Sequence, residues 1–138
     1  MKRIILFFSL MAATIAYSWA APADNRIVEL RDAITAGDLT DAEDMANALY
    51  AQKATCSASE LAELAIVYHR LAEKSGDPIS KYDFVLKVID CHKEAKAKDA
   101  AAATSAYKKA GLNFDKIVTD YTARLDALRQ EAANGFSF

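Results

Sequence analysis

The sequence is short of the residues that make tight turns, with 4 glycines and 2 prolines among 138 residues. An all-β sandwich or barrel needs many turns, and turns draw heavily on glycine and proline, so this fold class is excluded. An excess of one charge is also missing, since 17 lysines and arginines stand against 19 acidic residues. The net charge of −2 therefore gives no reason to expect nucleic acid as a partner.

Motifs that carry chemistry are missing as well. The sequence has no glycine-rich phosphate loop, no nucleophile elbow, no metalloprotease motif and no C-x-x-C pair. Its two histidines, His69 and His92, belong to no such pattern, and His69 is predicted at the partly exposed edge of a helix. We therefore predict that the protein is not an enzyme and holds no cofactor and no metal.

The first twenty residues have the three parts of a secretory signal peptide. Met1–Arg3 is basic, Ile4–Tyr17 is almost wholly apolar, and Ser18–Ala20 places small residues where a signal peptidase would cut after Ala20. The alternative is an N-terminal membrane anchor. The apolar run is shorter than the roughly 20 residues that span a bilayer, which favours cleavage.

Cleavage would leave one exported domain of residues 21–138, with flexible ends near 21–23 and 134–138. This 118-residue chain loses two basic residues and keeps 15 against 19 acidic ones. It contains 25 alanines, so its core of larger apolar side chains is small. We expect the domain to be periplasmic or secreted, with no stable membrane insertion after cleavage.

The exported part is predicted to be all-α, because alanine, leucine, lysine and glutamate dominate and the apolar positions recur at helical spacing. A first helix covers about residues 24–36 and ends at Gly37, which takes the left-handed C′ conformation at little cost. Thr40 and Glu43 have the spacing of a capping box for a second helix, which runs to about residue 54.

The third helix has the clearest apolar face and begins at a second capping box, Ser57 with Glu60. Gly76 ends it, and Asp77-Pro78 begins the fourth as N-cap and N1. A break is expected near Lys98–Asp99. The predicted inward face of the third helix consists of Leu61, Leu64, Ala65, Tyr68, Leu71 and Ala72.

A fifth helix is predicted over residues 100–110 and ends at Gly111, and a long sixth helix starts at Asn113 and closes at Asn134-Gly135. Gly37, Gly76 and Gly111 each separate two helices and lie 39 and 35 residues apart. The prediction is therefore about six helices in three antiparallel hairpins.

A hairpin period of this length is typical of α-solenoids. In the stretch Ala33–Leu39 a Gly-Asp turn precedes a helix-packing alanine, Ala42. Part of that unit is repeated before Gly76-Asp77, by Leu64, Ala65 and Tyr68. Over about residues 24–95 the chain resembles tetratricopeptide-type repeats. The resemblance implies a small α-solenoid, and an irregular helical bundle is the alternative.

Cys56 and Cys91 are the only cysteines, and both lie in the exported part. An oxidising compartment favours pairing, and the two residues fall near the same end of the predicted third and fourth helices. We predict a Cys56–Cys91 disulfide. A redox-active or metal-binding thiol is the alternative.

Two functions agree with these features. The first is an exported, non-catalytic helical module that binds another protein, with Tyr50, Tyr82 and Tyr107 as candidate contact residues. The second is a small periplasmic inhibitor or immunity protein that blocks an enzyme or toxin. The aromatic tail residues Phe136 and Phe138 either pack over the helices or dock in a partner as an extended peptide.

Overall fold

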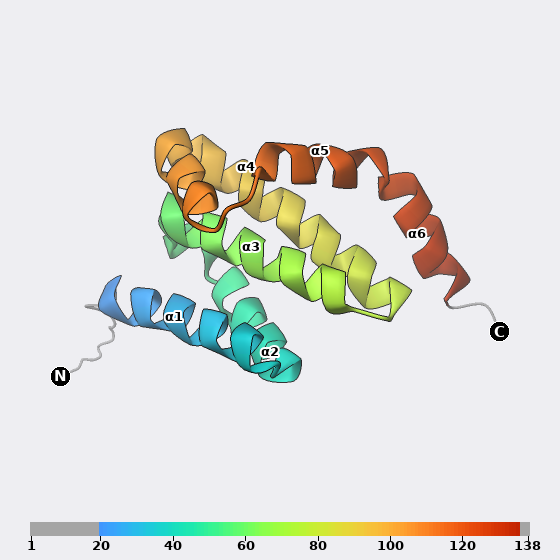
Figure 1. Cartoon of the computed structure of the whole chain (residues 1–138), viewed down its shortest axis with the longest axis horizontal. Helices are drawn as coiled ribbons and strands as arrows, with labels where there is room; N and C mark the ends of the chain where they lie inside the picture. The colour runs from blue at the N-terminus through green and yellow to red at the C-terminus, as the bar shows by residue number, and fades with distance from the viewer. Residues whose placement is uncertain (1–19, 136–138) are drawn as a thin grey trace.

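The computed structural model describes residues 20–135 (Figure 1). The tail residues Phe136 and Phe138 and nearly all of the predicted signal peptide lie outside the described residues. Every regular element within them is helical, which confirms the all-α prediction. The six α-helices are α1 (Ala20–Ala36), α2 (Leu39–Tyr50), α3 (Ala58–Lys74), α4 (Pro78–Lys109), α5 (Phe114–Ala123) and α6 (Leu125–Asn134), with a short 3₁₀ turn, η2 (Lys53–Thr55).

Two of the predicted glycine stops close their helices as expected. Gly37 has φ +83°, and the amide of Asp38 donates to the carbonyl of Ala33 (2.9 Å), which is the bonding of a Schellman turn. Gly111 has φ +73° and ends α4 in the same way. Gly76 differs, because α3 ends at Lys74 and Ser75 is already extended.

The helix starts follow the predicted caps with one exception. Ser57 and Glu60 form the predicted capping box, and Asp77 and Asn113 accept amide hydrogen bonds as predicted. The predicted box at Thr40 is wrong, because α2 already begins at Leu39. The turn at Gly37 brings the next residue, Asp38, to the N-cap position, where its carboxylate accepts from the Asp41 amide (3.2 Å).

The core forms around the α3–α4 hairpin, which α1 and α2 cover on one side (Figure 1). All six residues of the predicted inward face of α3 are buried. Other α3 residues are buried too, among them Ile66 and Val67, because helices pack against more than one side of α3.

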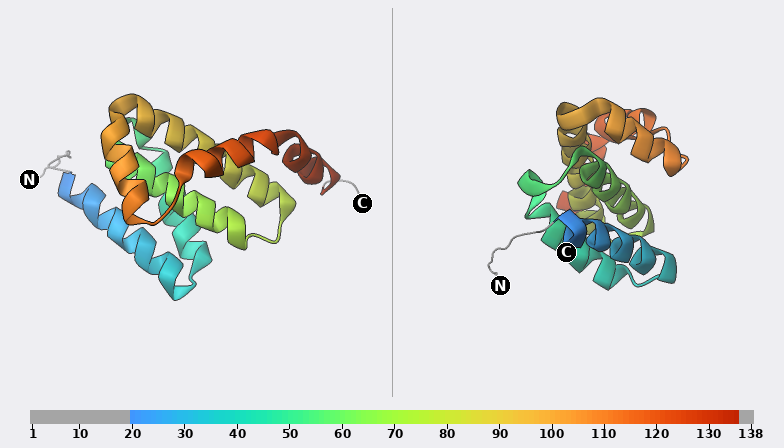
Figure 2. Two further views of the ribbon diagram at one scale, coloured as in Figure 1. Left: turned by 45° about the horizontal axis from the view of Figure 1, so that its top comes forward. Right: turned by 90° about the vertical axis from the view of Figure 1, so that its left-hand side faces the viewer.

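The predicted break in the fourth helix is present. Asp99 has φ −164° and ψ 96°, and its carboxylate then caps the following turn by accepting from the amide of Ala102 (3.1 Å). Residues 100–109, which we call the α4 arm, bend away from the line of the first part of α4 (Figure 2).

The predicted long last helix is instead two helices, divided at Arg124 (φ −100°, ψ 4°). Tyr121 on α5 packs against α3 through His69, whereas α6 packs against α4, and Gly135 lies close to Ile79 at the start of α4. The break redirects the apolar stripe, so that Leu128 of α6 is buried as well.

Candidate functional site

A groove of about 680 Å³ opens between three segments that are distant in the sequence. Its floor is one face of α3, and its walls are the second half of α1 and the last turn of the α4 arm. These segments are the first helix of each of the three hairpins that the glycine spacing predicts. The lining residues are Arg31, Ile34, Thr35, Glu63, Ile66, Val67, Arg70, Lys74, Ala106, Lys109 and Ala110.

The base of the groove is apolar. Ile66 and Val67 are only 5% and 2% exposed, and Ile34 of α1 and Ala110 beyond the α4 arm flank them, half-buried. The groove therefore offers a ligand an apolar strip at its base and polar side chains at its rim, and both contribute to its accessible lining.

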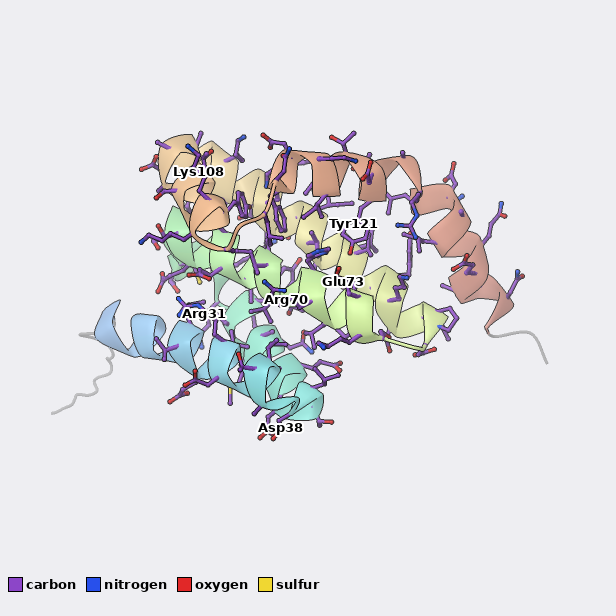
Figure 3. The ribbon with its side chains drawn as sticks, in the orientation of Figure 1. Arg31, Asp38, Arg70, Glu73, Lys108 and Tyr121 are labelled. Carbon is purple, nitrogen blue, oxygen red and sulfur yellow. The ribbon has the colours of Figure 1, made fainter. Side chains whose placement is uncertain are left out.

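The rim is basic. Arg31 makes a two-point ion pair with Glu63, with Nη2 to Oε2 at 2.7 Å and Nε to Oε1 at 3.3 Å, and this pairing raises the pKa of Arg31. Figure 3 shows Arg31 and Arg70 in the space between α1 and α3. Among the described residues, no carboxylate pairs with Arg70, Lys74 or Lys109. The groove thus carries a formal charge of +3 in a chain whose net charge is −2.

This groove was not predicted from the sequence, although part of its pattern is present there. Glu63, Ile66, Val67, Arg70 and Lys74 follow helical spacing and form a second stripe on α3, beside the core stripe. The stripe mixes apolar and charged side chains, so by itself it has the pattern of an ordinary helix edge. Only the placement of α1 and the α4 arm on either side makes it a groove.

The tyrosines proposed from the sequence lie elsewhere, and none of them lines the groove. The Tyr50 hydroxyl donates to Asp90 Oδ2 (2.6 Å), and burial together with this carboxylate raises the pKa of Tyr50 to about 12. Tyr107 is 5% exposed and stacks on Phe114, with ring centroids 4.3 Å apart. Tyr82 is half-buried near the start of α4.

Both cysteines are buried near the same end of the α3–α4 hairpin. Burial raises the pKa of the Cys91 thiol, and the negative charge of Asp90 raises it further, while the positive charge of Lys53 lowers it. No disulfide joins the two cysteines in the described structure, so the bond stays a prediction.

The two histidines contact the same aromatic ring, that of Phe114. His69 and His92 contact Phe114 at centroid distances of 6.0 and 5.6 Å, and each Nδ1 is hydrogen-bonded to a tyrosine hydroxyl, Tyr121 (2.7 Å) and Tyr107 (2.8 Å) respectively. His69 is 8% exposed, so its predicted place at a partly exposed helix edge is wrong. The helix edge is covered because α5 packs over it.

Burial lowers the pKa of both histidines. The effect of burial is larger than that of the nearby carboxylates, which raise the pKa values. These carboxylates are Glu73, 3.6 Å from His69 Nε2, and Asp115, 3.4 Å from His92 Nε2. The rings are therefore neutral near pH 7, and in this state they bind the tyrosines and fix α5 on the hairpin. Within residues 20–135 no three histidine, cysteine or acidic side chains gather closely enough to hold a metal ion.

Comparison with protein-family models, with curated proteins and with solved structures found no match to this chain. The likeness to tetratricopeptide-type repeats accordingly stays a prediction. Within the described part of the chain, no helix combines the length and apolarity needed to cross a bilayer.

Proposed function

We propose that the protein is an exported, non-catalytic helical module that binds another protein through the basic groove. One observation carries the proposal: the first helix of each predicted hairpin contributes to a single concave surface, and three unpaired cations line it. Stacked helical hairpins commonly bind their partners on such concave surfaces.

The proposal of a non-catalytic role is supported by what the histidines do. The chain has two histidines, and each is engaged inside the protein by a tyrosine hydroxyl and by the Phe114 ring. Their geometry accounts for both as packing groups that hold α5 in place, with no external substrate needed.

Export is proposed from residues 1–20, and it has a direct test. The mass of the protein recovered from the extracytoplasmic fraction should correspond to a chain that begins at Ala21. A mass that includes residues 1–20 would overturn cleavage.

We also propose that Cys56 and Cys91 become a disulfide after export. The two thiols lose two protons and two electrons to a disulfide-type oxidant of that compartment, and an S–S bond forms between the two sulfur atoms. Titration of the denatured, unreduced protein should then find no free thiol, whereas two free thiols would contradict the bond.

Binding through the groove can be tested by site-specific photo-crosslinking in the producing cells. A photoreactive residue at Thr35, which is exposed in the groove, should give a discrete protein adduct. The same residue at Ser105, which is exposed on the α4 arm outside the groove, serves as the control and should not give it. No adduct from Thr35, or the same adducts from both positions, would contradict the proposal.

A further inference from the structure

We infer that the occupant of the groove is an acidic, amphipathic helix of the partner protein, whose carboxylates pair with Arg70, Lys74 and Lys109. The inference rests on the proposed function and adds the chemistry of the partner. It follows from how charge is distributed over the described residues.

Six of the 14 lysines and arginines in residues 27–135 pair with a carboxylate. Arg31 pairs with Glu63, Lys53 binds Asp90 and Glu94, and further pairs recur along α4, α5 and α6. Of the eight that do not, three lie together in the groove: Arg70, Lys74 and Lys109. Since the chain is net acidic, the groove's formal charge of +3 is opposite in sign to the charge of the whole protein.

Arg70 is the most informative of the three. Lys74 and Lys109 lie in the last turns of α3 and α4, where a cation is stabilised by the helix dipole, so their positions have an internal explanation. Arg70 lies a full turn before the end of α3 and is half-buried. A guanidinium can form two parallel hydrogen bonds with a carboxylate, so a carboxylate of the ligand would give Arg70 an ion-pair partner.

The spacing of the cations fits a helix. Arg70 and Lys74 are four residues apart on α3, which places them about 6 Å apart along its axis, at 1.5 Å per residue. Acidic side chains four residues apart on a facing helix have the same spacing. Lys109 lies on the opposite wall, where it can reach carboxylates on the other flank of that helix.

The shape of the site selects a short segment over a flat surface. A volume of about 680 Å³ lies in the range of concave sites that enclose a ligand. Ile34, Ile66 and Val67 provide an apolar strip at its base, which suits the apolar side of an amphipathic helix. A planar anionic membrane would meet the rim but leave this strip uncovered.

Two synthetic helical peptides of about 14 residues, roughly 21 Å long, test the inference. They share one apolar stripe and differ only in flanking residues, which are glutamate in one and lysine in the other. Isothermal titration against the full exported protein should show binding of the glutamate peptide alone. Its affinity should fall as salt rises from about 50 to about 300 mM, because exposed charges are screened.

Neighbouring lysines provide matched variants. Lys109 and Lys108 are both exposed in the last turn of α4, but only Lys109 lines the groove. Lys109→Glu should weaken binding of the glutamate peptide about fivefold, while Lys108→Glu should leave it unchanged. The triple variant R70E/K74E/K109E should bind the lysine peptide more tightly than the glutamate peptide. If the circular dichroism of the triple variant differs from that of the wild type, the comparison of Lys109→Glu with Lys108→Glu decides the test.

Several outcomes would overturn the inference. They are equal binding of both peptides, equal loss in the Lys108 and Lys109 variants, binding of neither peptide, and stronger binding to phosphatidylglycerol vesicles than to the glutamate peptide. A specific adduct from Thr35 together with any of these would leave the proposed function intact and remove only the acidic helix.

Discussion

Asn47 joins three helices at one point. Its Oδ1 accepts from the hydroxyl of Tyr68 on α3 (2.7 Å) and from Nζ of Lys87 on α4 (3.2 Å). The Tyr68 side chain is fully buried, so its hydroxyl has no easy access to water if Asn47 is lost. A variant that leaves a buried donor without an acceptor loses more stability than a variant in which both groups of the hydrogen bond are removed.

We therefore expect Asn47→Ala to lower the free energy of unfolding by about 2 kcal/mol and Tyr68→Phe to lower it by about 1 kcal/mol. The double variant should lose less than the sum of the two, because the second change removes the orphaned hydroxyl. Urea unfolding followed by circular dichroism measures all three. Additive losses would show that the two groups are not coupled.

Two neighbouring residues compete for the cap of α2. The sequence favours Thr40, but in the structure the side chain of Asp38 accepts the amide of Asp41. Asp38→Ala should therefore cost about 1 kcal/mol of unfolding free energy. Thr40→Ala should change it by no more than about 0.5 kcal/mol. A larger loss of unfolding free energy in Thr40→Ala than in Asp38→Ala, measured by urea unfolding, would place the cap at Thr40. The control Asp38→Asn should keep most of the stability that Asp38→Ala loses, because asparagine caps a helix equally well.

At the scale of elements, α5 is held in place by the two histidines. In the unfolded chain both have ordinary pKa values near 6.5, and burial lowers both values in the folded protein. Below about pH 6.5 the unfolded state therefore binds more protons than the folded state. The free energy of unfolding consequently decreases as the pH is lowered. The charged groups facing them are Glu73 and Arg70 at His69, and Asp115 and Lys96 at His92.

The expected outcome is a free energy of unfolding that is flat above about pH 7.5 and decreases between about pH 6.5 and pH 5. The carboxylates of Asp77 and Asp90, whose pKa values are lowered, lose their contribution only at more acidic pH. A His69→Gln/His92→Gln variant serves as the control and should have a flatter profile over this window. A wild-type profile that is already flat, or an equal slope in the variant, would contradict this role.

What could be predicted from the sequence was local. The Ser57 cap, the Gly37 and Gly111 stops and the break near Asp99 depend on a few adjacent residues, and the structure contains them. The division at Arg124 was not predictable, because the stripe of α5 and α6 continues through it and only packing against α3 and α4 breaks it. The groove was missed for the same reason, since its three walls come from segments far apart in the chain.

At the scale of the whole molecule, a small core makes a covalent cross-link valuable. The proposed exported chain would have 118 residues, and many of them are alanine, a side chain that buries little surface. Cys91 is buried in α4, and Cys56 is buried just before the start of α3, so a bond between them would tie together the two helices at the centre of the fold. The loop that this bond would close, from Cys56 to Cys91, spans 35 residues.

Closing a loop of this length is expected to stabilise the protein by about 3–4 kcal/mol, mainly by restricting the unfolded chain. Reductant should therefore lower the Tm of the exported protein on the order of 10 °C in calorimetry, since each kcal/mol moves the Tm of a domain of this size by several degrees. A Cys56→Ala/Cys91→Ala variant should melt near the reduced wild type and be insensitive to reductant. If the Tm of the wild type does not move with reductant, the fold relies on helix packing alone, and the disulfide is not part of its stability.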